Sequence, residues 1–261
     1  GTYNGDVDKQ MKKVIEYFET KQAAAEIYVG TDYKETSISS NVYKIIRNCQ
    51  LQGGLAIACG DAGIGKTQAC RQYYREHGTN CTYITVNPCI KSSKSVLELI
   101  GSKLNVSSGS VSRLWLEISS KLSDGMVIIV DEAQHLTRNA IDTLRSLCDC
   151  FDEKGQTLGI CFVGNETTVS RLGGKQKAEF AQIRNRTKNT RFYSVKQIKK
   201  SDIEMLFPDI REDAAAVEFL LRIAQSPQAI RGAVNLYSNA LDNGNVTAKG
   251  LSAIAKYMDL A

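Results

Sequence analysis

The sequence predicts an α/β protein in which helices cover both faces of a parallel β-sheet and a small, purely helical part follows. Three observations predict this. Short, continuously apolar runs alternate with helix-length segments, as in buried parallel strands joined by crossover helices. Beyond Lys200 only helical patterns follow. The length of 261 residues suits a core with a smaller satellite.

Four apolar runs are the expected strands, and helices are expected between and after them. The strands are placed at 55–59, 81–86, 126–130 and 158–163. The helices that join them are placed at 66–77, 93–104, 110–122 and 140–151. The helical part is expected to begin at Ser201 and Asp202, and to continue over 213–225, from Pro227 in a first helical turn, and over 247–260.

The pattern divides the chain into three parts: an N-terminal helical extension at 1–44, an α/β core at 45–199 and a helical lid at 200–261. Within the extension, an amphipathic helix is expected over 4–22. Its apolar side carries Val7, Met11, Val14, Ile15 and Phe18. Packing of this side on the chain's own core and docking on a neighbouring protomer are both open. The start at Gly1 rather than Met indicates a processed or trimmed chain.

Composition excludes several classes of protein. Hydrophobic residues make up 43% and charged residues 23%, which is ordinary for a globular chain and unlike a disordered or fibrous one. No apolar run is long enough to cross a membrane, so no membrane partner is expected. The eight cysteines form no CxxC pair and only two histidines are present, which argues against a zinc site or a disulfide framework.

Positive charge is concentrated in one segment. The net charge is +5, yet residues 171–200 contain ten Lys or Arg against the single acid Glu179. The rest of the chain is therefore net acidic. Such a segment suits binding to a polyanion, and a solvated basic face is the alternative.

The motif GDAGIGKT follows an apolar run and opens a helix, which is the context of a phosphate-binding loop. Backbone N–H groups of such a loop and the helix N-terminus bind phosphate oxygens. Lys66 is expected to neutralise the β- and γ-phosphates, and Thr67 to offer its hydroxyl to Mg²⁺. The expected nucleotide contacts are Gly60, Asp61, Ala62, Gly63, Ile64, Gly65, Lys66, Thr67 and Gln68.

Two further apolar strands end in polar residues. MVIIVDE delivers Asp131, expected to hold the magnesium hydration shell, and Glu132, expected to polarise the attacking water. LGICFVGN ends in Asn165. That amide either contacts the γ-phosphate or the water, or simply favours a turn.

Together these features resemble the AAA+ ATPases. Finer strings resemble the phage Mu B-type transposition ATPases: GDAGIGKT, VDEAQHL, FVGNE, AEFAQIRNR and PQAIRG. The resemblance implies an AAA+ core with a helical lid that binds ATP and Mg²⁺. It also implies assembly with other copies as filaments on double-stranded DNA, delivery of that DNA to a DDE-type transposase, and disassembly on hydrolysis in a bacterial cytoplasm. Such proteins usually carry an additional N-terminal DNA-binding domain, for which 1–44 is short.

The resemblance also implies residue roles. Asn165 corresponds to the first sensor, and Arg231 to a second sensor that reaches the γ-phosphate in cis. Arg184 or Arg186 corresponds to an arginine finger for the neighbouring subunit. DNA phosphate contacts are implied at Lys91, Lys94, Ser110 and Arg113. Helix capping by serines in these segments is the alternative.

We therefore interpret the chain as an ATP-dependent DNA-binding AAA+ protein of a transposition system, with weak hydrolysis that DNA or a partner stimulates. Two alternatives remain open. One is a helicase loader or another replication-type ATPase. The other is a nucleotide-gated protein scaffold with negligible turnover and no DNA binding.

Overall fold

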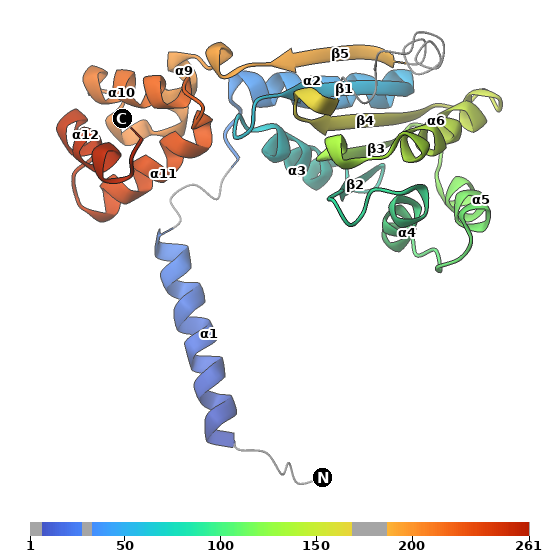
Figure 1. Ribbon diagram of the computed structural model, residues 1–261, viewed down its shortest axis with the longest axis horizontal. Helices are drawn as coiled ribbons and strands as arrows, with labels where there is room; N and C mark the ends of the chain where they lie inside the picture. Colours follow the sequence, from blue (N-terminus) through green and yellow to red (C-terminus); the bar gives the residue numbers. More distant parts are fainter. Residues whose placement is uncertain (1–6, 28–32, 169–186, 261) are drawn as a thin grey trace.

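The computed structural model describes residues 7–27, 33–168 and 187–260 (Figure 1). In this part of the chain, a sheet of five parallel strands has the order β2-β3-β4-β1-β5. The strands are β1 (Gly54–Gly60), β2 (Cys81–Thr85), β3 (Met126–Asp131), β4 (Leu158–Gly164) and β5 (Thr187–Tyr193). The four predicted strands and their parallel arrangement are confirmed.

Strand β5 is not predicted by the apolar pattern. It lies at one edge of the sheet and pairs with β1 on its inner side. Of its seven residues, only Tyr193 is buried. A half-exposed edge strand needs no continuous apolar run, so a search for such runs misses it.

Helices cover both faces of the sheet, as predicted (Figure 1). Helices α2 (Ser37–Gln52) and α3 (Lys66–His77) pack on one face together with Ala56 and Ala58 of β1. The other face packs Leu55 and Ile57 against α4 (Ser93–Lys103), α5 (Val111–Lys121) and α6 (Arg138–Asp152). Side chains alternate along β1, so consecutive residues of this strand pack into the cores on opposite faces of the sheet.

Helix α2 is absent from the predicted elements. Thr36 caps it by accepting a hydrogen bond from the Ser39 N–H at 3.3 Å. Its buried face includes Ile38, Val42 and Ile46, which pack against the sheet. The proposed division after residue 44 falls inside α2, so a division before Ser37 suits this packing better.

Helix α1 (Val7–Ile27) extends away from the body of the molecule (Figure 1). The relative exposures of its apolar side chains are 57% for Met11, 48% for Val14, 51% for Ile15 and 62% for Phe18. Packing of this stripe on the chain's own core is therefore not observed among the described residues.

The part after residue 199 is helical, as predicted. Its helices are α9 (Lys200–Leu206), α10 (Ala214–Ala224), α11 (Ala229–Asp242) and α12 (Ala248–Tyr257). Of the short 3₁₀ turns, η3 (Pro208–Ile210) lies in this part, whereas η1 (Ala133–His135) and η2 (Val195–Gln197) precede it. The placement of Pro227 in a first helical turn is wrong, because Pro227 lies in the turn that precedes α11.

The lid is joined to the core by a buried carboxylate. Asp202 in α9 accepts hydrogen bonds from the Ser37 N–H at 2.7 Å and the Lys199 N–H at 2.9 Å. Apolar residues of the lid belong to the same core cluster as α2 and α3. None of the described helices combines the length and apolar character that a bilayer crossing requires.

Candidate functional site

The predicted chemical groups meet at one edge of the sheet. Strands β1, β3 and β4 are adjacent and parallel, so their carboxyl ends lie together. We call this region the carboxyl edge, and it comprises 60–67, 131–132 and 164–165. Asn165 follows β4, the strand that lies between β3 and β1.

The phosphate-loop motif connects β1 to α3, with Gly65 as the N-cap residue of α3. Ile64 is fully buried, whereas Ala62 and Gln68 are exposed. Backbone N–H groups at the start of a helix can bind an anion. The predicted loop-to-helix context is therefore present.

Asp61 forms hydrogen bonds with the end of β5 and the residues that follow it. Its N–H donates to the Tyr193 carbonyl at 3.0 Å, and its carboxylate accepts from the Val195 N–H at 2.8 Å. Both groups therefore tie the loop to the end of β5. A nucleotide contact by Asp61 stays a prediction, and these bonds do not favour it.

Lys66 lies at the centre of the loop. Its Nζ donates to the carbonyl oxygens of Gly60 at 2.9 Å and Asp61 at 2.6 Å. Burial lowers the pKa of the Lys66 ammonium, and the carboxylates of Asp131 and Glu132 partly offset this by raising it. The cation and these two carboxylates are therefore close enough to interact.

Asp131 is buried at the end of β3, with 2% relative exposure. Hydrogen bonds from the Thr67 hydroxyl and the Tyr83 hydroxyl oppose the rise in the pKa of Asp131 that burial causes. Tyr83 donates at 3.0 Å. The hydroxyl of Thr67 and the carboxylate of Asp131 are oxygen ligands of the kind that Mg²⁺ prefers, so this pair fits a Mg²⁺ ion.

Tyr83 is a site residue that the sequence reasoning misses. It comes from β2, and burial together with Asp131 raises its pKa to about 12. The phenol therefore remains a hydrogen-bond donor at neutral pH. A tyrosine in a predicted strand, with a hydroxyl that needs a partner when buried, is the one signal in the sequence that could have found it.

Glu132 directly follows β3 and has a left-handed backbone, with φ 58° and ψ 33°. Left-handed conformations of residues other than glycine cost energy and are common at functional sites. Its carboxylate accepts a hydrogen bond from Gln134 Nε2. Gln134 is a second residue that the sequence reasoning misses.

Asn165 adopts the turn that the sequence reasoning gives as one alternative. Its Oδ1 accepts from the Thr167 N–H at 3.0 Å and the Thr167 hydroxyl at 2.6 Å. The turn engages the oxygen end of this amide. A phosphate or water contact by its nitrogen end stays a prediction.

The lid contacts the phosphate loop at Arg231. The Arg231 N–H donates to the Gly63 carbonyl at 3.2 Å. Gly63 has φ +75°, and a Cβ there would lie 3.2 Å from the Cβ atoms of both Ala229 and Arg231. The start of α11 is therefore adjacent to the loop, although the Arg231 side chain is exposed. The predicted finger candidates Arg184 and Arg186 lie outside the described residues.

The predicted DNA contacts lie on helices α4 and α5 or just before their first residues, away from the lid (Figure 1). We call the region formed by Lys91, Lys94, Ser110 and Arg113 the α4–α5 surface. Lys94 lies 3.9 Å from Glu98 and Arg113 lies 2.6 Å from Glu117, both as i,i+4 ion pairs. These two basic side chains are exposed and already have partners.

Serines cap both helices of this surface. Ser110 caps α5 by accepting from the Arg113 N–H at 3.3 Å. The cap of α4 is Ser92, one residue before the Ser93 start considered from sequence, and it forms a capping box with Ser95. The capping alternative is therefore observed, and DNA contact stays a prediction.

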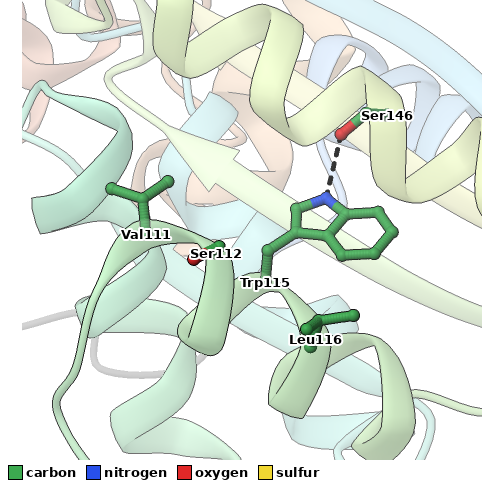
Figure 2. Close-up of a pocket in the computed structure, with 5 residues that line it drawn as sticks. All are labelled: Val111, Ser112, Trp115, Leu116 and Ser146. Atoms are coloured by element: carbon green, nitrogen blue, oxygen red, sulfur yellow. Dashed lines mark hydrogen bonds between the residues drawn. The ribbon is translucent and has the colours of Figure 1, made fainter.

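A shallow hollow of about 650 Å³ lies beside α5 (Figure 2). Its lining comprises Val111, Ser112, Trp115, Leu116 and Ser146. Trp115 Nε1 donates to the Ser146 hydroxyl at 2.9 Å, which fixes the indole ring at the wall of the hollow. The lining is mainly apolar, so the hollow does not suit a phosphate group.

Comparisons with known proteins agree with the phosphate-loop interpretation of the carboxyl edge. Residues 49–172 match the AAA domain family. ATP-dependent target DNA activator B of Escherichia phage Mu is 28% identical over 256 residues, which cover 95% of this chain and 77% of the relative. The Mu-like prophage FluMu DNA transposition protein B of Haemophilus influenzae is 28% identical, with coverage of 90% and 82%.

Solved structures share the fold at low sequence identity. Cdc6p from Pyrobaculum aerophilum has a TM-score of 0.62 at 15% identity, with 87% of this chain and 69% of that chain covered. The RuvB Holliday junction branch migration motor of Thermotoga maritima has a TM-score of 0.52 at 16% identity, with coverage of 84% and 68%.

Proposed function

We propose that this chain, an AAA+ protein homologous to the phage Mu B-type target DNA activators, is an ATP-dependent DNA-binding protein of a transposition system. It assembles with ATP on double-stranded DNA, delivers that DNA as target to a DDE-type transposase, and disassembles on hydrolysis in a bacterial cytoplasm. The observation that carries the proposal is the meeting of Thr67 and Asp131 at the carboxyl edge, beside Lys66.

In this proposal the nucleotide binds along residues 60–68, with Lys66 opposite the β- and γ-phosphates. Thr67 and Asp131 hold Mg²⁺, which when bound neutralises charge that develops on the phosphate oxygens. Glu132 orients and polarises the attacking water. Asn165 and Arg231 contact the γ-phosphate, and the contact between Gly63 and Arg231 supports a lid that responds to the nucleotide.

Assembly makes hydrolysis dependent on a neighbouring copy. Arg184 or Arg186 serves as the finger in trans, so an isolated subunit turns over slowly. The exposed apolar stripe of α1 supports docking of this helix on the next protomer. The α4–α5 surface contacts DNA phosphates, which gives binding without sequence preference.

The test measures ATP hydrolysis and DNA retention together at low salt. We expect duplex DNA to stimulate phosphate release, and ATP to be required for retention on DNA of any sequence. Electron microscopy of protein, ATP and duplex DNA should show filaments. ATP binding without DNA retention or turnover would instead favour a scaffold, and closed rings that load a helicase onto DNA would favour a replication role.

A further inference from the structure

One side chain connects the ends of β3 and β4. Gln134 lies in the η1 turn that follows β3. Its Nε2 donates to Glu132 Oε2, and its Oε1 accepts from the Asn165 N–H at 3.3 Å. The amide therefore spans two residues that come from neighbouring strands.

The partners fix which end of this amide faces which strand. A carboxylate only accepts hydrogen bonds, and a backbone N–H only donates them. The nitrogen end of Gln134 must therefore face Glu132, and the oxygen end must face Asn165. A flipped amide would lose both bonds, so this arrangement has one orientation.

The backbone around Gln134 makes room for this contact. A Cβ at Gly164 would lie 2.5 Å from Gln134 Oε1, which is closer than atoms approach. Any residue other than glycine at position 164 would therefore require the Gln134 amide to move. The left-handed backbone of Glu132 is a second costly feature at the same point.

We propose that Gln134 is a positioning residue for ATP hydrolysis, a role that rests on the proposed function of Glu132. Its bond to Oε2 fixes the rotamer of the Glu132 carboxylate and leaves Oε1 to polarise water. The bond to Asn165 anchors the amide on the backbone of the strand that separates β3 from β1. Preorganisation of this kind acts on turnover rather than on nucleotide affinity.

Two substitutions test the bridge, one that keeps the acceptor for Asn165 and one that removes both bonds. Gln134→Glu keeps the size and the acceptor for Asn165, but places a carboxylate against Glu132. Gln134→Met keeps the length and removes both bonds. We expect both variants to lower kcat by about 10–10²-fold with KM for ATP nearly unchanged, since a small misplacement of a reacting group has an effect of this size. Binding of a fluorescent ATP analogue and the thermal unfolding temperature should stay close to those of the wild type.

A matched control lies on α3. Gln72 Nε2 donates to Glu76 Oε1 at 2.6 Å on the exposed side of the helix. Gln72→Met removes the same kind of bond outside the carboxyl edge, and we expect unchanged turnover.

A double-mutant cycle with Glu132→Gln distinguishes positioning from a structural role. If Gln134 acts through Glu132, adding Gln134→Met to Glu132→Gln should cause little further loss of turnover. Additive losses, an increased KM for ATP, or faster basal hydrolysis by Gln134→Met would overturn the proposal. Normal turnover by Gln134→Met beside an inactive Glu132→Gln would overturn the role of Gln134 alone. Absence of hydrolysis by the wild type, with and without DNA, would overturn the proposed function as well.

Discussion

At the carboxyl edge, predicted residues from elements distant in sequence lie close together. On the α4–α5 surface, the predicted residues are exposed and engaged in contacts with nearby residues of their own helices. Thr67 and Asp131 are 64 positions apart in sequence, yet the Thr67 hydroxyl is close enough to the Asp131 carboxylate to lower its pKa. On the α4–α5 surface, the partners of Lys94, Ser110 and Arg113 lie two to four residues away. Long-range contacts of buried polar groups are specific to a site, but caps and i,i+4 pairs occur on any helix.

Removal of the Glu132 carboxylate should have the largest effect and should sharpen this contrast. Glu132→Gln replaces an acceptor that polarises water with a neutral amide of the same size. We expect turnover to fall by about 10²–10⁴-fold while ATP binding persists, because general-base catalysis contributes that much. Phosphate release and binding of a fluorescent ATP analogue measure the two quantities.

The same variant should prolong assemblies on DNA, since hydrolysis is the proposed route to disassembly. Electron microscopy after ATP addition should show complexes that outlast those of the wild type. Rapid turnover by Glu132→Gln would remove Glu132 from the catalytic role and weaken the contrast between the two regions.

Substitution of Gly63, where the phosphate loop contacts the lid, should have the next largest effect, a loss of stability. Gly63→Ala places a Cβ at φ +75° and 3.2 Å from two lid Cβ atoms. We expect a loss of about 1–3 kcal/mol of unfolding free energy from the strained backbone and the crowding. Denaturant unfolding measures it.

Gly155→Ala is the matched control for that prediction. Gly155 has φ +67°, but a Cβ there meets nothing within 4 Å. Its destabilisation therefore reports the backbone cost alone. Equal losses in the two variants would mean that the loop and the lid do not restrict each other.

Sequence reasoning predicts the carboxyl edge well because its motifs combine residue type with strand and helix context. It predicts neither Tyr83 nor Gln134, since both act through the reach of a side chain from a neighbouring strand or turn. The same limit applies to the fold. Strand β5 lacks an apolar run, and a search between apolar strands does not reach α2, which precedes β1.

Removal of the Ser110 cap should lower stability by a smaller amount, and it tests the role of the α4–α5 surface. Ser110→Ala removes the acceptor for the Arg113 N–H, and we expect the unfolding free energy to fall by about 1 kcal/mol. Ser110→Asn supplies another capping oxygen and should restore stability. If Ser110→Ala binds DNA as tightly as the wild type, the serine serves the helix alone.

Removal of the Lys94 charge should give the smallest effect, because one exposed phosphate contact contributes little. Lys94→Ala should weaken binding a few-fold on all duplex sequences alike and reduce the slope of log affinity against log salt by about 1. The ion pair with Glu98 is long and exposed, so its loss should leave stability nearly unchanged. DNA titrations at several salt concentrations measure both quantities.

Lys103 provides the control at the other end of the same helix, where it is also exposed. Lys103→Ala removes an equal charge, so it reports the general effect of lower net charge on DNA binding. A larger loss for Lys94→Ala than for Lys103→Ala would assign the start of α4 to the DNA. Equal losses would mean that overall charge attracts DNA, and a loss confined to certain sequences would contradict a phosphate contact. In either case the α4–α5 surface would lose its assigned role while the carboxyl edge kept its own, because the ion pairs of Lys94 and Arg113 and the cap at Ser110 are formed within α4 and α5.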